Sequence, residues 1–235
     1  MKKGSLVLAA LLALCTVLAA CSPSPAASSG SPVPSASEAP AAAQTPSPTE
    51  GSLPSPTPDA EAVRGDVEAM MPILDSLVRT MGIRDTTPYA PRDGEFFWYV
   101  LYLIGENWGQ AHPLVQRGED GFVTVPRQVM QEFASAAFLD YDDLLPLPES
   151  MESSVQYDEG LDAYLLAPSD MGSTDTRLDG LSVQGDALVA RVGLYEGEDF
   201  LGALEFTLVE NPYADGISNP IYLYTVSGAA AAEPN

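Results

Sequence analysis

The chain has few of the residue types on which most enzyme sites depend. Its 235 residues include one histidine, two cysteines and ten basic residues against 33 acidic ones. A Ser-His-Asp site would need His112, which lies in a loop-like stretch, and no Gly-x-Ser-x-Gly turn supplies a nucleophile. With no second histidine, an ordinary zinc site is not expected, and both lysines lie at the N-terminus. We therefore predict no cofactor and no metal.

The first twenty residues are built like a secretory leader. Lys2 and Lys3 form a basic tip, an apolar stretch runs from Leu6 to about Leu14, and small residues follow. A membrane span needs roughly 20 predominantly apolar residues, and this stretch is shorter. Residues 1–20 are predicted to be a signal peptide, so the rest of the chain is expected outside the cytoplasm.

The end of this leader resembles a known processing motif. Leu18-Ala19-Ala20-Cys21 is similar to the lipobox of bacterial lipoprotein precursors. The resemblance implies that cleavage makes Cys21 the new N-terminus and that its thiol carries a diacylglyceride, usually with an added N-acyl chain. Several acyl chains anchor a protein firmly, so we expect attachment to the bacterial cell membrane. The alternative is an ordinary signal peptide with a coincidental cysteine nearby.

Cysteine chemistry is excluded from the processed chain by the same motif. Cys15 would be discarded with the leader, which leaves only the lipidated Cys21. No disulfide can then form within the chain, although the compartment would permit one. The stability of the fold must come from its core.

Residues 21–58 are predicted to be a disordered linker. Beyond Cys21 they are nearly all Ser, Pro, Ala, Thr or Gly. Such a segment cannot bury enough apolar area to offset its ordering entropy, and its Pro-rich runs favour polyproline II. We expect a spacer that holds the folded part away from the membrane surface.

Residues 59–228 are predicted to form a single domain, followed by a disordered tail over 229–235. Once the leader is removed, eight arginines remain against 33 acidic residues, for a net charge of −25. A surface this negative repels phosphate backbones and anionic headgroups. Nucleic acid is therefore excluded as a partner, and the membrane must be reached through the acyl chains.

Helical patterns dominate the first half of this domain. Apolar residues recur at helical spacing over 63–81, with Asp59 as the expected N-cap and Pro72 expected to kink or divide the helix. A short strand over 121–125 leads into Pro126 at the start of a further helix. The buried side of that helix is expected to carry Val129, Met130, Phe133, Ala137 and Phe138.

The run over 96–104 is apolar on every side, so periodicity alone cannot separate a buried helix from a central strand. Asp93 before it, Gly105 after it and the length of the run favour a helix. The segment over 141–154, with two prolines and several acids, is predicted to be loop.

Strand patterns follow, and they predict an antiparallel meander. Gly185-Asp186 and Glu196–Asp199 are short enough to close hairpins. The expected strands cover 163–167, 178–184, 187–195, 200–210 and 221–227. The predicted fold class is α+β, with N-terminal helices packed on one curved antiparallel sheet. By this element order alone, the domain resembles the NTF2-like and cystatin-like domains of many bacterial lipoproteins.

Acidic and aromatic residues are the remaining candidates for a site. With 33 acids, close carboxylates arise by coincidence, and the acidic loops over 169–175 and 211–216 lack the spacing of an EF-hand. Trp98 is expected in the core. The candidate ligand-binding residues are Trp108 and His112, which could line one pocket, and Tyr213 in the loop before the last strand.

The expected function is that of a non-catalytic, lipid-anchored extracytoplasmic module with no catalytic residues. Its partner would be a protein, a peptide or other envelope material. The alternative is a carboxylate-dependent glycan hydrolase of the cell envelope, because that chemistry needs only two acids facing each other across a cleft. A buried acid in an apolar setting would favour the hydrolase.

Overall fold

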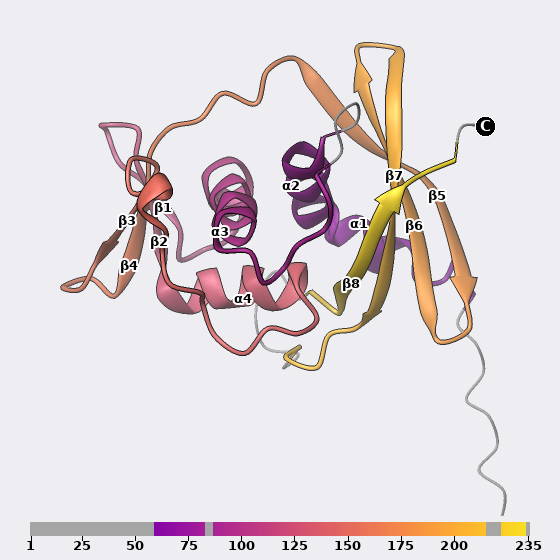
Figure 1. The fold of residues 1–235 in the computed structure, drawn as a ribbon, viewed down its shortest axis with the longest axis horizontal. Helices are drawn as coiled ribbons and strands as arrows, with labels where there is room; N and C mark the ends of the chain where they lie inside the picture. Colours follow the sequence, from indigo (N-terminus) through magenta and orange to yellow (C-terminus); the bar gives the residue numbers. More distant parts are fainter. Residues whose placement is uncertain (1–58, 83–86, 215–221, 234–235) are drawn as a thin grey trace, which may run out of the picture. The chain divides into compact units, whose positions relative to one another are not determined.

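The structure is a computed structural model and describes residues 59–82, 87–214 and 222–233. The predicted leader, Cys21 and the linker lie outside the described residues. In this part of the chain the fold is α+β, as expected, with α-helices and two four-stranded antiparallel sheets. The helices lie between the two sheets (Figure 1).

The bounds of the helical elements, and then of the strands, are as follows. The helical elements are α1 (Arg64–Ala69), α2 (Met71–Met81), α3 (Gly94–Leu103), the π-helix η1 (Ile104–Trp108), the 3₁₀ turns η2 (Gly109–Ala111) and η3 (Glu149–Met151), and α4 (Arg127–Ala137). The strands are β1 (Gln116–Arg117), β2 (Val123–Pro126), β3 (Val155–Asp158), β4 (Ala163–Leu166), β5 (Thr174–Gln184), β6 (Ala187–Glu196), β7 (Asp199–Glu210) and β8 (Tyr224–Ala231).

The interruption expected at Pro72 is present. α1 ends at Ala69 and α2 begins at Met71, which places Pro72 in the first turn of α2. Proline is tolerated there because the first N–H groups of a helix have no partner within the helix. The predicted cap was wrong. Val63 precedes α1, whereas the Asp59 carboxylate accepts the backbone N–H of Glu61 in a turn ahead of it.

The apolar run that begins at Phe96 is helical, which decides between the two structures that its pattern allowed. The Asp93 carboxylate accepts the backbone N–H of Phe96 at 2.9 Å and caps α3. Trp98 is buried, as predicted, and its indole N–H donates to the carbonyl of Leu145. Most of α3 is buried, and Tyr99, which is 42% exposed, marks its open side.

The strands do not form the single meander that the sequence predicted. β5, β6, β7 and β8 are consecutive antiparallel neighbours, joined by the expected hairpins at Gly185-Asp186 and Gly197-Glu198. β4 belongs instead to a second sheet of order β1-β2-β4-β3, between β2 and β3. β3 and β4 form a hairpin through residues 159–162, whereas β2 pairs with β4 across a long sequence separation, as in Thr124 with Leu165. Such a short strand carries no local signal of a distant partner.

Two further boundaries differ from the prediction. The segment predicted as loop over 141–154 includes the 3₁₀ turn η3, and the unpredicted strand β3 follows it. β8 continues to Ala231, into the segment predicted as a disordered tail. Ala231 pairs with Leu204 of β7, so the backbone groups of this segment form hydrogen bonds within the sheet.

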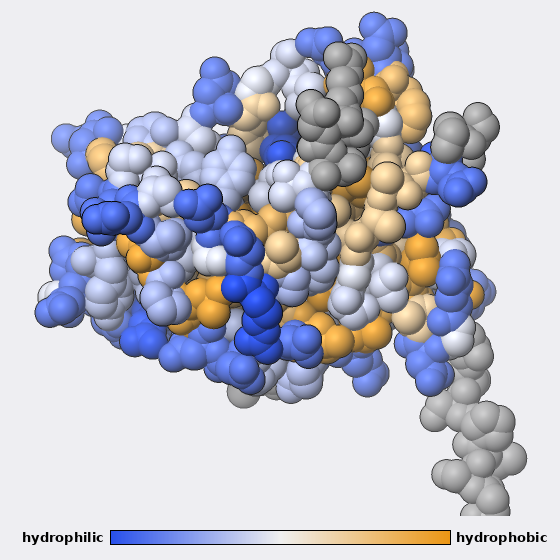
Figure 2. All heavy atoms as spheres, in the orientation of Figure 1, coloured by the Kyte–Doolittle hydropathy of each residue, from blue (hydrophilic) through white to orange (hydrophobic). Residues whose placement is uncertain are grey.

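The core is shared by the helices and both sheets. β6 and β7 turn alternate side chains toward the helices, among them Leu188, Ala190, Leu204 and Phe206, all buried. On the face shown in Figure 2, hydrophilic residues predominate at the periphery and hydrophobic ones show through near the middle. One hydrophobic core thus joins the helices to both sheets.

Gly105 marks a close approach of η1 to the smaller sheet. A Cβ at this position would lie 2.5 Å from a methyl carbon of Leu166 and 3.3 Å from one of Val125. We expect Gly105→Ala to lower the free energy of unfolding by about 1–3 kcal/mol through overpacking. Urea denaturation measures this change.

Gly65 is the matched control, because a Cβ there meets nothing within 4 Å. Gly65→Ala lies in α1 and should be neutral or stabilising by up to about 1 kcal/mol. Equal destabilisation by both substitutions would show that the close approach at Gly105 has no energetic consequence.

Candidate functional site

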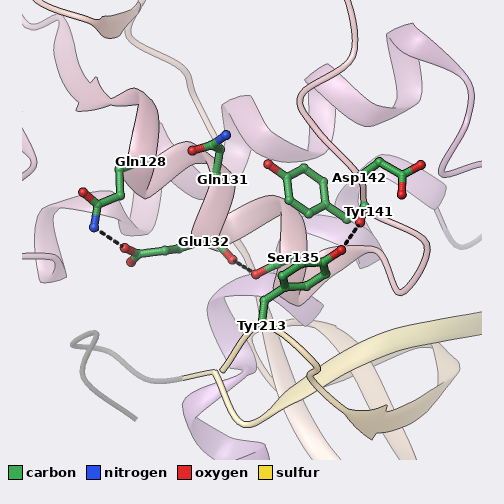
Figure 3. Close-up of a pocket in the computed structure, with 7 residues that line it drawn as sticks. All are labelled: Gln128, Gln131, Glu132, Ser135, Tyr141, Asp142 and Tyr213. Carbon is green, nitrogen blue, oxygen red and sulfur yellow. Dashed lines mark hydrogen bonds between the residues drawn. The ribbon is translucent and has the colours of Figure 1, made fainter. Parts of the chain in front are cut away.

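A pocket of about 370 Å³ lies against the outer side of α4 (Figure 3). Three segments contribute to it: α4, the loop that follows α4, and the loop that follows β7. The lining residues are Gln128, Gln131, Glu132, Ser135, Tyr141, Asp142 and Tyr213.

The amphipathic pattern of α4 explains its contribution to this pocket. Val129, Met130 and Phe133 are buried, as the sequence predicted. The four lining residues of α4 recur at spacings of three and four on the other side of the helix. Burial of the apolar side therefore presents two amides, one carboxylate and one hydroxyl together.

Two tyrosines form one wall of the pocket. The rings of Tyr141 and Tyr213 meet edge to face with centroids 5.7 Å apart, and the Tyr213 hydroxyl donates to the Tyr141 carbonyl at 2.8 Å. Asn211 positions Tyr213, because its Oδ1 accepts the backbone N–H of Tyr213 while its Nδ2 donates to the carbonyl of Tyr222. These bonds fix a ring that is 53% exposed.

The Tyr141 hydroxyl remains protonated over the physiological range. Burial, and then the charge of Asp143, raise the pKa of Tyr141 to about 12. The pocket therefore offers a neutral phenol at this position, and its negative charge comes from carboxylates.

His112 lies behind the pocket and is buried. Its Nε2 is 3.3 Å from Oε2 of Glu132, and its Nδ1 accepts the backbone N–H of Leu114 at 3.2 Å. Nδ1 therefore faces the backbone and Nε2 faces the carboxylate of Glu132. With Nδ1 engaged by the backbone and Nε2 turned to a carboxylate, His112 has no nitrogen free to act as a general base.

Glu132 is the lining residue with an unsatisfied atom. Its Oε1 accepts the side-chain amide of Gln128 at 3.2 Å, as Figure 3 shows. Its Oε2 is buried and has no hydrogen bond of acceptable geometry, because the N–H of His112 is close but poorly aligned. A buried acceptor without a partner costs free energy, and in native proteins such an atom calls for an explanation.

The opposite side of the pocket is acidic and open. Asp142 is 85% exposed, and its contact with Arg92 is long, at 3.5 Å. Gln131 donates from its amide to Asp143 at 3.2 Å. No lysine, arginine or histidine is among the lining residues.

The structure brings only some of the predicted site residues together. Tyr213 lines the pocket, and His112 contacts it through Glu132. Trp108 is 39% exposed and has another partner, because its indole N–H donates to the carboxylate of Asp75 at 3.0 Å. Glu132 was not predicted, although its position on the polar side of an amphipathic helix was visible in the sequence.

Two carboxylates are deeply buried, and both are fully engaged. Asp75 accepts hydrogen bonds from Arg79, Trp108 and Thr176. Glu106, in η1, accepts from Arg117 and Ser169. Each acid therefore sits in a polar, arginine-paired environment rather than the apolar one that a catalytic acid of a glycan hydrolase requires.

These networks have a structural role. Asp75 and Arg79 connect α2 to η1 and β5, and Glu106 connects η1 to the segment that leads from β4 to β5. They join the helix layer to the connection between the two sheets.

A second pocket of about 450 Å³ lies beside α3, with Phe96, Tyr99 and Met151 in its lining. Its two acids are already engaged: Asp93 caps α3, and Glu95 accepts the hydroxyl of Ser150 at 2.7 Å. Its lining contains none of the buried side-chain atoms that lack a partner. The pocket against α4 is therefore the stronger candidate.

No family model, curated protein or solved structure matches this chain. Within the described ranges, no three His, Cys, Asp or Glu side chains are grouped so as to hold a metal ion. None of the helices described here has the length and apolar character required to cross a bilayer.

Proposed function

We propose that this chain is a lipid-anchored extracytoplasmic binding module, without catalytic activity, whose ligand occupies the pocket against α4. The observation that carries the proposal is the pocket itself, which polar side chains of α4 and two fixed tyrosines line together. The polar side chains would hydrogen-bond to a ligand, and the exposed ring of Tyr213 would cover apolar parts of it. The partner is a protein, a peptide or other envelope material.

The anchor and the compartment rest on the N-terminal sequence. The Leu18–Cys21 motif supports lipidation of Cys21, and the Ser/Pro/Ala-rich residues up to 58 support a spacer that lets the module meet its partner. For the domain we propose an NTF2-like relationship. β5–β8 with α2 and α4 against them support it, whereas the second sheet has no counterpart in that resemblance.

The environments of His112 and of the two deeply buried acids among the described residues support binding over catalysis. Nδ1 of His112 accepts a backbone N–H and its Nε2 faces Glu132 at 3.3 Å, and Asp75 and Glu106 are paired with arginines. One observation favours the second candidate, a glycan hydrolase: Glu132 and Asp142 line the same pocket. Under that alternative, Glu132→Gln and Asp142→Asn would each abolish hydrolysis of purified envelope glycans.

Site-specific photo-crosslinking in intact cells tests the binding proposal. A benzoyl-phenylalanine at Gln131, inside the pocket, should give a discrete adduct with an envelope component. The same residue at Gln184, exposed at the end of β5, is the matched control and should not. Tyr213→Ala should remove the adduct formed from Gln131. Identical adducts from both positions, or none from Gln131, would contradict the proposed site.

A further inference from the structure

We propose that two copies of this chain pair through the open edge of β8, so that their larger sheets join into one. This inference does not depend on the pocket against α4.

β8 is an edge strand of the larger sheet, because β7 is its neighbour on one side only. The first part of this edge is covered. The carbonyl of Val226 accepts the backbone N–H of Leu139 at 3.0 Å and the hydroxyl of Tyr89 at 2.9 Å. Ser227 is the extra residue of a bulge, and the strand continues beyond it to Ala231. Residues 228–231 are therefore where another chain could pair.

The alternation of hydrogen bonds identifies the main-chain groups that are available on this edge. Ala232 donates its N–H to the carbonyl of Ala203, so residues 228, 230 and 232 turn their main-chain groups toward β7. The N–H and C=O groups of Ala229 and Ala231 therefore point away from β7. Among the described residues, no backbone group outside the sheet forms a hydrogen bond with them. Such a row of unpaired groups is a template for a further strand.

The other sheet edges in the described ranges are better protected against pairing. β1 has two residues and β3 four, and short edge strands offer few free groups. β5 carries the charged residues Asp175, Arg177 and Asp179 and is bulged between Leu178 and Gly180. β8 has no charged residue and no proline. Its edge is therefore the least protected of the four.

A second β8 matches this edge in register. In an antiparallel pair about a twofold axis at Ala230, Ala229 of each copy lies opposite Ala231 of the other. The free groups of both copies are then satisfied by four hydrogen bonds, and the small side chains do not obstruct the approach.

A foreign peptide matches the edge less well. Peptides that add a strand to a sheet gain their specificity from pockets beside the edge, which accept alternate side chains. The pockets against α4, beside α3 and beside Tyr224 have no residue of 227–231 in their linings. Pairing between two copies needs no such pocket.

The negative charge of the chain opposes self-association, but the charges beside this edge are balanced. Glu205 of β7 lies opposite Ala230. Its carboxylate is 3.7 Å from Arg191, whose guanidinium also donates to the carbonyl of Glu233. Moderate salt screens the remaining repulsion between the two copies.

Single cysteines in the full chain, in zwitterionic detergent and moderate salt, test the pairing. Ala230→Cys places its thiol opposite that of the second copy, with Cα atoms about 4.5 Å apart, which a disulfide can span. Mild oxidation should convert most of this variant to a linked dimer.

Ala232→Cys is the matched control, because the same register would hold its two copies about 14 Å apart. It should give no linked dimer, and neither should Ser182→Cys, which is exposed on β5. The unmodified chain gives the background from Cys15 and Cys21.

Ala231→Pro tests the hydrogen bonds themselves. Proline removes an N–H that β7 does not use, so the fold, followed by circular dichroism, should be kept. The dissociation constant of the dimer, measured by sedimentation equilibrium, should rise about ten- to a hundredfold, since two of the four hydrogen bonds are lost. Ala231→Val keeps the N–H and should leave this constant nearly unchanged.

Three results would overturn the inference. The first is equal crosslinking of Ala230→Cys and Ala232→Cys, or none at residue 230. The second is an equal dissociation constant for the unmodified chain and Ala231→Pro. The third is a benzoyl-phenylalanine at Ala230 that captures a different envelope protein and no second copy, which would assign the edge to a foreign strand. The crosslink from Gln131, which tests the proposed function, is independent of all three.

Discussion

Cys21→Ser is expected to abolish lipid attachment completely. The thiol is the nucleophile that takes the diacylglyceride, and a serine hydroxyl at neutral pH is too weak a nucleophile to replace it. Without the lipid, lipoprotein-type cleavage should also fail, and the chain should keep its leader. Metabolic labelling with an alkyne fatty acid, followed by mass spectrometry of the N-terminal peptide, measures both effects.

Cys15→Ser is the matched control for this experiment, because Cys15 lies in the same leader. It should be lipidated and cleaved like the unmodified chain. A Cys21→Ser chain that is acylated and processed normally would contradict the lipoprotein assignment. Recovery of native protein with an unmodified residue 21 would contradict it equally.

Asp75→Ala is expected to lower the free energy of unfolding by about 3–5 kcal/mol, because it breaks a buried ion pair and leaves the charge of Arg79 without its carboxylate. The Asp75 side chain is 1% exposed and that of Arg79 12%, with Nε of Arg79 2.9 Å from the carboxylate. The indole of Trp108 and the hydroxyl of Thr176 would lose their acceptor as well. Since whole domains are stable by only about 5–15 kcal/mol, this loss is large. Urea denaturation followed by circular dichroism measures it.

Two variants identify the cause of this loss. The double variant Asp75→Leu/Arg79→Met removes both charges at once and should recover most of the stability, because no unpaired charge remains buried. Asp142→Asn changes an acid that is 85% exposed and should alter stability by less than about 1 kcal/mol. If the double variant were as unstable as Asp75→Ala, lost packing or the lost acceptor of Trp108 and Thr176, rather than the unpaired arginine, would be responsible.

Elements marked by local signals were predictable from the sequence. Asp93 caps α3, Pro126 immediately precedes α4, and the two hairpin turns were found at their positions. Each of these signals acts within a few residues, through a cap, a fixed φ angle or a tight turn. The end predicted at Gly105 was wrong, because the chain continues through it as the π-helix η1. The pairing of β4 with β2 was not predictable, because it joins segments far apart in the chain. The hairpin of β3 with β4 was missed, although the short turn with Gly160 between them is a local signal.

The candidate site was only partly predictable. His112 could be selected because histidine is unique in the chain, and Tyr213 because it is an aromatic residue in a predicted loop. Glu132 could not, since it is one of 33 acidic residues. What distinguishes Glu132 is burial of one oxygen without a hydrogen bond, and burial depends on the residues that pack around α4.

The sequence by itself determined the helices of the core, the hairpins of the larger sheet, the large negative charge, the limit to a single cysteine after the expected processing, and the lipobox-like motif. These properties follow from composition or from interactions between close neighbours in the chain. Only the tertiary structure decided that two sheets enclose the helices and that Asp75 and Glu106 are neutralised by arginines. It alone brought Tyr141 and Tyr213 to Glu132, because contacts between distant segments depend on packing that no local pattern encodes.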